Sequence, residues 1–306
     1  MLNDYYQNVG IKGFFKRYGV VNALRRGSFM ANRLHLVQDY EMRKVLWQRA
    51  ASKKAQEFLK FKNENPEGLV FTDAEVTDPV WLYWDQGLVQ APDLVKKCYA
   101  AARKFHGDNV ILLTAENLGQ YLHMPRYLID KVENGEIPLA IYTDLMRIAL
   151  LEHYGGTWMD ATVYLTDQIP QTIHDSDFFV FHNSLGLLQN PALYPVWFIH
   201  AKKHNTLIRQ IRNVAFAYWK REKHLREYLF SNLIFTAVIH DNPNEEAKIP
   251  YMGSDYSEYL VRKLGDDYNP KEFEWIKKLT GIHKLTYKLD DSINREGSIY
   301  HHIMTG

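Results

Sequence analysis

The chain has 306 residues, 46% of them hydrophobic and 14% aromatic, which is enough for one large domain or a domain with an appendage. Its net charge is +1, and its single cysteine, Cys98, excludes an internal disulfide and argues against a disulfide-built secreted protein. The sequence lacks an apolar run of membrane-spanning length, and its start lacks the cationic-then-apolar order of a signal peptide. We therefore expect a cytoplasmic location.

Basic residues are concentrated at the start. The first 60 residues hold 12 Lys/Arg and 4 Asp/Glu, a charge of +8, and the other 246 hold 25 (37 − 12) and 32 (36 − 4), a charge of −7. Apolar residues at helical spacing, such as Phe14, Tyr18, Val21 and Leu24, predict amphipathic helices. Two interpretations stay open: binding to an anionic membrane surface, or packing on the main domain with a solvated basic face. The charges are scattered and no reader motif occurs, so we expect no nucleic-acid partner.

We expect residues 1–65 to form a basic helical extension and residues 76–306 the main domain, joined through a polar linker at 63–73. In the main domain, residues 80–84 predict a strand, 92–105 a helix and 110–114 a second strand. This β-α-β unit implies a mostly parallel sheet. Ligands bind at the carboxyl ends of such strands, which makes three residues at or just beyond the end of the first strand candidates for the binding site: Trp84, Gln86 and Gly87.

The next elements are a long helix at 138–154, ended by Gly155 and Gly156, and strands at 157–165 and 177–183. From residue 194 to 240 the sequence predicts helices. His182 and Asn183 follow the 177–183 strand, where they would either contact a ligand or cap the strand end.

Two acids and one base lie around the glycine pair. Asp144 and Arg147 are three residues apart on the long helix and share a face. Asp160 follows across the turn, so its carboxylate is expected near the same edge of the sheet. From spacing alone, a structural ion pair with a turn residue remains the simpler interpretation.

The segment YTDLMRIALLEHYGGTWMDATV resembles the signature of the capsular polysaccharide synthesis glycosyltransferases, akin to glycosyltransferase family 32. The similarity extends through WLYWDQGLVQAPDLVKKCYAAARK and GIHKLTYKL and covers residues 78–302. It implies the GT-A fold, an α/β Rossmann-like domain. It also implies retaining transfer of a sugar from a nucleotide sugar, expected to be a UDP-hexose. The acceptor would be a polyprenyl-diphosphate-linked oligosaccharide in bacterial surface polysaccharide synthesis, which suits a peripheral position on the inner membrane face.

The resemblance also implies roles for individual residues. Asp144 and Arg147 would contact the ribose and donor sugar, and Asp160 would be the first acid of an Asp-x-Asp motif. That motif normally holds Mn²⁺ or Mg²⁺ against the diphosphate. Here Thr162 replaces the second acid, and a hydroxyl is a weaker ligand for a hard cation. This departure leaves open a second function, that of a non-catalytic nucleotide-sugar-binding component of a polysaccharide assembly complex.

The tail supplies the remaining candidates. A metal, if used, would be held by Asp160 with a histidine from the tail, and lysines there would hold the departing diphosphate. The candidate histidines are His283, His301 and His302, with His283 preferred, and the candidate lysines are Lys284 and Lys288.

Overall fold

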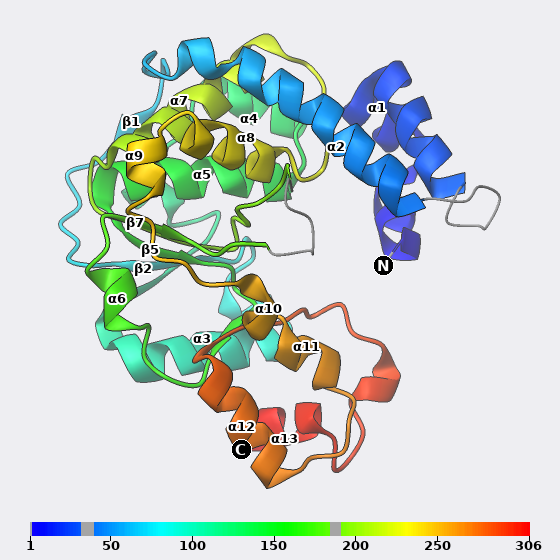
Figure 1. The fold of residues 1–306 in the computed structure, drawn as a ribbon, viewed down its shortest axis with the longest axis vertical. Helices are drawn as coiled ribbons and strands as arrows, with labels where there is room; N and C mark the ends of the chain where they lie inside the picture. The colour runs from blue at the N-terminus through cyan, green and yellow to red at the C-terminus, as the bar shows by residue number, and fades with distance from the viewer. Residues whose placement is uncertain (1, 32–39, 184–190) are drawn as a thin grey trace.

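The fold is built on a five-stranded sheet in the order β3-β2-β5-β8-β7 (Figure 1). The computed structural model describes residues 2–31, 40–183 and 191–306. The sheet strands are β2 (Val80–Tyr83), β3 (Val110–Leu113), β5 (Gly156–Met159), β7 (Phe178–Val180) and β8 (Phe198–Ala201). β3, β2 and β5 run parallel, and β8 is antiparallel to both β5 and β7. The protein is therefore α/β with a mixed, mostly parallel sheet.

The strand register brings several loops to one edge of this sheet. Trp81 pairs with Trp158, and Ile199 pairs with both Trp158 and Val180. β5 and β7 run in the same direction because both are antiparallel to β8. Asp160 lies two residues after Trp158 and His182 two residues after Val180, so both lie at about the same level, beside the end of β2. This is the carboxyl edge, where open α/β sheets usually bind ligands.

Two helical layers cover the sheet. On one face lie α4 (Arg126–Glu133), α5 (Leu139–Tyr154), α7 (Thr206–Arg221) and α8 (Phe230–His240), and on the other α3 (Asp93–His106) and α6 (Gln171–His174) (Figure 1). Neighbouring strand residues alternate between the two cores: Trp81 and Trp158 join the core under α5, while Leu82 and Met159 join the core on the opposite face. The sheet is thus buried on both sides.

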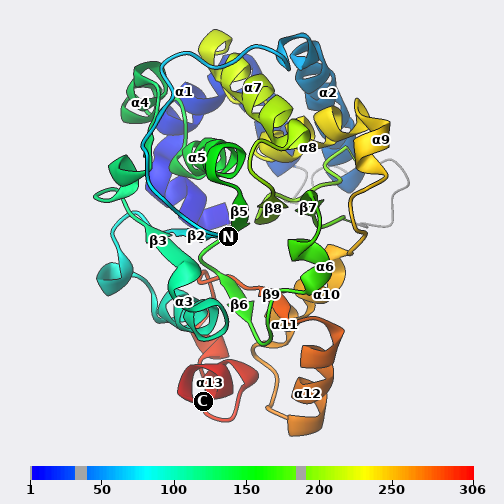
Figure 2. The same cartoon turned by 90° about the vertical axis from the view of Figure 1, so that its left-hand side faces the viewer.

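A two-stranded antiparallel sheet, β6 (Val163–Leu165) with β9 (Ile282–Lys284), connects the main sheet to the C-terminal helices (Figure 2). These helices are α10 (Ser254–Ser257), α11 (Tyr259–Lys263), α12 (Pro270–Leu279) and α13 (Ile299–Thr305), while the short α9 (Pro243–Glu246) packs beside α8. Leu260, Phe273 and Ile299 pack with Cys98 of α3 in a third apolar cluster. The pairing of β6 with β9 fixes the tail beside the end of β5.

The N-terminal helices are α1 (Leu2–Ala31) and α2 (Tyr40–Glu57). Two glycines with positive φ, Gly10 and Gly19, interrupt α1. Phe14 and Tyr18 are buried and join the core under α5, and α2 packs beside α8 (Figure 1). The interpretation that the apolar face packs on the main domain is confirmed for these residues. The sequence pattern of apolar positions at helical spacing continues through Leu34 and Val37, which lie outside the described residues.

Three expectations about elements need correction. The 63–73 linker contains strand β1 (Val70–Phe71), which pairs with β4 (Leu122–His123). The expected strand at 157–165 is two strands, because the chain turns at 160–162 and leaves the main sheet. The helix expected from residue 194 is wrong at its start, where β8 fills the sheet between β5 and β7. The division into 1–65 and 76–306 stays a prediction.

Candidate active site

The site begins at the reversal between α5 and β5. Gly155 and Gly156 have φ of 73° and 91°, a region that side chains rarely adopt. A Cβ on Gly155 would lie 2.7 Å from the Lys203 backbone nitrogen, and one on Gly156 would lie 2.2 Å from the Pro79 carbonyl oxygen. Only glycine fits both positions. The reversal lays α5 antiparallel to β5, so the start of the helix meets the end of the strand.

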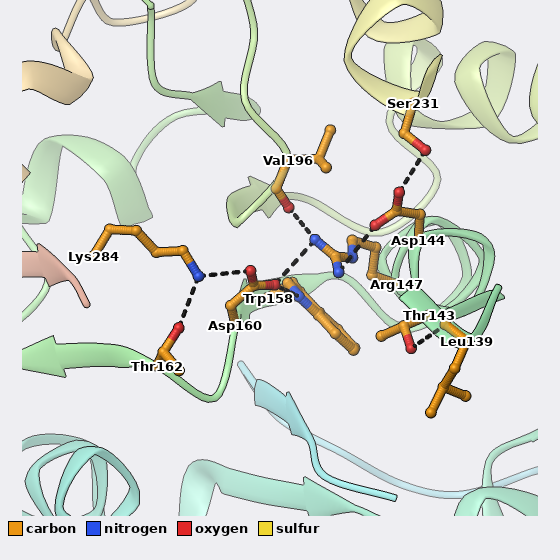
Figure 3. Close-up of polar contacts among 10 residues, drawn as sticks. All are labelled: Leu139, Thr143, Asp144, Arg147, Trp158, Asp160, Thr162, Val196, Ser231 and Lys284. Atoms are coloured by element: carbon orange, nitrogen blue, oxygen red, sulfur yellow. Dashed lines mark hydrogen bonds and ion pairs between the residues drawn. The ribbon is translucent and has the colours of Figure 1, made fainter. Parts of the chain in front are cut away.

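A continuous chain of polar contacts crosses this meeting point (Figure 3). Arg147 Nη2 lies 3.0 Å from Asp144 Oδ1, and Arg147 Nη1 lies 3.1 Å from Asp160 Oδ1. Lys284 Nζ donates to Asp160 Oδ2 at 2.9 Å and to Thr162 Oγ1 at 2.8 Å. Helix α5, the end of β5 and the tail strand β9 therefore all contribute to one cluster of charges, the Asp144–Lys284 cluster.

The inner half of this cluster is closed. Arg147 also donates to the Val196 carbonyl, and its guanidinium carbon lies 4.8 Å from the centroid of the Trp158 ring. Ser231 donates to Asp144 Oδ2 at 2.5 Å. The side chains of Arg147 and Asp144 are only 6% and 12% exposed, which leaves little of either for a ligand to contact.

The outer half is open to solvent. The side chains of Asp160 and Lys284 are 27% and 23% exposed. The Asp160 backbone nitrogen donates to the Trp197 carbonyl at 2.9 Å, and Trp158 Nε1 lies 3.3 Å from Asp160 Oδ1. The carboxylate is thus fixed from several sides while part of its surface stays accessible.

The two acids have opposite pKa shifts. Burial raises the pKa of Asp144 above its usual value, although Arg147 and Ser231 oppose the shift. Burial would also raise the pKa of Asp160, but the neighbouring Lys284 and Arg147 cations outweigh it and hold that pKa below its usual value. Asp160 is therefore the firmly ionised acid of the pair.

The loop after β2 lies close to this cluster. Trp84 packs with Leu88 against a small group that includes Ala161, the residue after Asp160. Its ring also meets Tyr287 of the tail edge-on, with centroids 5.3 Å apart. Gly87 has a φ of 75°, and Gln86 is exposed beside it. The structure therefore places the predicted Trp84 loop next to Asp160.

His182 and Asn183 lie at the same edge in a tightly bonded loop. The His182 backbone forms hydrogen bonds with Met252 and Ser254, and its ring meets Tyr194 edge-on and Tyr251 at a tilt. The Asn183 side chain donates to the Ala192 carbonyl at 3.0 Å and accepts from Ser254 at 2.9 Å. These contacts give Asn183 a role in holding the loop, and a ligand contact by either residue stays a prediction.

The predicted tail ligands do not meet at Asp160. His283 pairs with Tyr164 while Lys284 pairs with Val163, so their side chains project to opposite faces of the small sheet. His283 is fully buried and bonds Thr166 at 2.9 Å, and burial lowers its pKa to about 4. His302 stacks on Tyr268 at 3.7 Å in the C-terminal helical cluster.

Within the described residues, neither His301 nor Lys288 forms a hydrogen bond or ion pair with Asp160. His301 lies next to His302 on α13, and Lys288 is exposed near the Tyr287 ring. Within residues 2–31, 40–183 and 191–306, no group of three His, Cys, Asp or Glu side chains could hold a metal ion. Both oxygens of Asp160 already accept contacts from cations. The expected Mn²⁺ or Mg²⁺ ligand set of Asp160 with His283, His301 or His302 does not fit this arrangement.

Sequence reasoning missed three residues of the site, two that contact the Asp144–Lys284 cluster and one that contacts Trp84. Trp158 lies two residues before Asp160 on the same strand, and this spacing could have indicated a shared face. Ser231 comes from α8 and Tyr287 from the tail, and nothing in the local sequence connects them to Asp144 or Trp84. Each reaches the site only through the tertiary fold.

A family model described as "Capsular polysaccharide synthesis protein" matches residues 29–303. This match starts well before residue 78, so it includes part of the N-terminal helical region that the resemblance left out. A solved structure named "PaToxG Glycosyltransferase" has 14% sequence identity and a TM-score of 0.38, with 86% of this chain and 97% of that chain covered. No curated protein matches.

Proposed function

Because the chain belongs to the capsular polysaccharide synthesis protein family, we propose that it is a glycosyltransferase of the GT-A type. It would transfer a hexose from a UDP-sugar to a polyprenyl-diphosphate-linked oligosaccharide. The observation that carries the proposal is the partly exposed Asp160–Lys284–Thr162 group at the carboxyl edge of the sheet. In the proposed reaction, Lys284 would supply the cation that the departing diphosphate needs.

The chemistry of transfer accounts for this arrangement. When the bond between the anomeric carbon and the β-phosphate oxygen breaks, its electron pair leaves with the diphosphate, and positive charge develops on the sugar. Fixed cations at the site of developing negative charge are usually the largest catalytic contribution. We assign this role to the Lys284 ammonium, with the Thr162 hydroxyl as a second donor and Trp84 beside the nucleobase.

We assign attack on the anomeric carbon to the acceptor hydroxyl. Asp144 and Asp160 are each held in ion pairs with Arg147, which makes either carboxylate a poor nucleophile. The new bond forms from the acceptor oxygen on the face that the diphosphate leaves, and the hydroxyl proton passes to the departing phosphate oxygen. This route retains the anomeric configuration.

Asp144 and Arg147 fit a positioning role better than direct contact with the donor. Their low exposure leaves the guanidinium to hold Asp160 in place, while Ser231 and Asp144 hold the guanidinium. This assignment differs from the sugar and ribose contacts expected from the resemblance.

The test is a panel of nucleotide sugars, scored by release of the nucleoside diphosphate in the presence and absence of acceptor. At least one donor is expected to turn over, and Asp160→Asn should lower kcat roughly 10²- to 10³-fold. Asp93→Asn, which changes an exposed acid at the start of α3, is the matched control. If the intact protein binds a donor but does not turn it over, the proposed enzymatic function is contradicted, and the alternative of a non-catalytic nucleotide-sugar-binding component is favoured.

The location proposal rests on the surface of α1. Ile11, Val20, Val21 and Leu24 are 75%, 64%, 61% and 62% exposed, although neighbouring residues of the same helix are buried. Exposed basic residues, among them Lys12, lie beside them. None of the helices in the described ranges is long and apolar enough to cross a membrane. An apolar and basic surface of this kind suits peripheral binding to anionic lipid.

Vesicle sedimentation tests this location. The protein should bind vesicles with a substantial phosphatidylserine fraction at low salt and bind phosphatidylcholine vesicles weakly. Replacing Val20 and Val21 by Asp should reduce binding, while Lys278→Asp on α12 should not. Equal sedimentation of both variants, or no binding by the intact protein, would contradict the proposal.

A further inference from the structure

The residue that meets Thr162 is a lysine fixed by strand pairing. Lys284 lies opposite Val163 in the β6–β9 register, and the Leu285 backbone nitrogen donates to the Thr162 carbonyl at 2.9 Å. These backbone contacts hold the base of the side chain on both sides. Its ammonium then reaches Asp160 Oδ2 and Thr162 Oγ1 at 2.9 and 2.8 Å.

Those two oxygens come from the first and third positions of Asp160-Ala161-Thr162. In an Asp-x-Asp motif the same two positions would carry two carboxylates around one divalent cation. The charge balance is the same in both arrangements: two negative charges with one doubly charged ion, or one negative charge with one ammonium. The change of the second acid to Thr and the placement of Lys284 therefore compensate each other.

A divalent cation would have little to bind at this position. Asp160 Oδ1 already faces Arg147 at 3.1 Å and Asp160 Oδ2 faces Lys284, so a third cation would be repelled by both. Hard cations take six or more oxygen ligands, and a Thr hydroxyl is a weak one. The Lys284 side chain is 23% exposed, and its ammonium has three N–H donors, of which Asp160 and Thr162 take two, so one remains for a phosphate oxygen.

The geometry points to Lys284 as a built-in replacement for the divalent cation, so that this chain binds the diphosphate of its donor without metal. Thr162 is part of the same device because its hydroxyl accepts from the ammonium and adds no second negative charge. The inference rests on the proposed function and specifies how that site recognises a diphosphate.

Calorimetry of UDP and other nucleoside diphosphates tests it directly. The intact protein should bind one of them with the same affinity in EDTA and in Mn²⁺. Lys284→Met should weaken binding roughly 10- to 100-fold, the range expected for a lost hydrogen bond to a charged group. Lys278→Met, an exposed lysine of α12, should bind as the intact protein does. Thermal unfolding of each variant checks that the fold is kept.

A second variant tests the inference by a gain of metal dependence, so the test does not rely only on a loss of diphosphate binding. Thr162→Asp combined with Lys284→Met creates an Asp-x-Asp motif without the ammonium. Diphosphate binding by this double variant should become Mn²⁺-dependent. The signal of free Mn²⁺ can be followed by electron paramagnetic resonance. Adding the double variant and nucleotide should decrease this signal. Adding the intact protein and nucleotide should decrease it no more than nucleotide alone does.

The outcomes separate the two levels of the proposal. Diphosphate binding by the intact protein that requires Mn²⁺ would overturn the role of Lys284 and leave the glycosyltransferase proposal standing. Metal-independent binding that survives Lys284→Met would do the same. Failure to bind any nucleoside diphosphate in either buffer would overturn both the role of Lys284 and the glycosyltransferase proposal.

Discussion

Replacing Arg147 by Met should expose how strongly the site depends on one buried cation. The guanidinium lies 3.0 Å from Asp144 and 3.1 Å from Asp160, and its side chain is 6% exposed. Met has a similar length but no charge, so Asp144 would stay buried with Ser231 as its remaining partner. Removing one partner of a buried ion pair costs about 3 to 5 kcal/mol.

This loss of free energy of unfolding corresponds to a decrease in melting temperature. For 306 residues the entropy of unfolding is about 0.64 kcal/mol/K, so the loss corresponds to a fall of roughly 5 to 8 °C in Tm. The loss should depend on pH. An acid whose pKa is higher in the folded than in the unfolded state takes up a proton on folding. The stability deficit is therefore largest above the folded-state pKa and shrinks as the pH falls through it.

Calorimetric or urea unfolding at about pH 8 and about pH 5.5 gives the measurement. Burial already raises the pKa of Asp144 in the intact protein, and loss of Arg147 removes the main opposing charge. Asp144→Asn combined with Arg147→Met should recover a large part of the lost stability, because no buried charge is left unpaired. A deficit that is the same at both pH values and in both variants would refute this reasoning.

Three further predictions concern the scaffold. Gly156→Ala should cost more than about 2 kcal/mol in denaturant unfolding, because its Cβ would meet the Pro79 carbonyl at 2.2 Å; Gly135→Ala, also at positive φ but with open space, is the control and should cost less. Burial raises the pKa of Cys98 to about 12, so iodoacetamide should label it only in concentrated guanidinium, and rapid native labelling would contradict this. Burial, with smaller electrostatic contributions, lowers the pKa of His200 to about 4. The contribution of neutral His200 to the free energy of unfolding should therefore be complete above its unfolded-state pKa of 6.5 and should fall by up to about 3 kcal/mol as the pH drops towards 4. His200→Asn should flatten this dependence of stability on pH.

Local patterns predicted the first half of the main domain well. The helix at 92–105 has clear periodicity and lies between two short apolar runs that form strands, and the long helix before Gly155 is confirmed at nearly its predicted bounds. The error at β8 has a physical cause. Its four residues, Phe198–Ala201, are all buried because the strand lies between β5 and β7, so the segment has no alternation of buried and exposed positions that distinguishes a strand from a helix.

The site was predictable only as far as the chain itself connects its parts. Asp144, Arg147 and Asp160 lie within 17 residues across one turn, and their proximity is confirmed. The choice between His283 and Lys284 depends on the register of β9 against β6, where a shift of one residue exchanges the two faces. That register is a long-range contact, which spacing along the sequence cannot specify.

The pairing of β6 with β9 has a consequence for biosynthesis. Residues 163–165 leave the ribosome long before residues 282–284, so a nascent chain can complete most of the central sheet while Asp160 still lacks its lysine. The site is finished only when β9, in about the last twelfth of the polypeptide, pairs with β6. An incomplete translation product would thus contain the acid without the cation beside it, and nicking between α12 and β9 should separate a persistent scaffold from a lost activity.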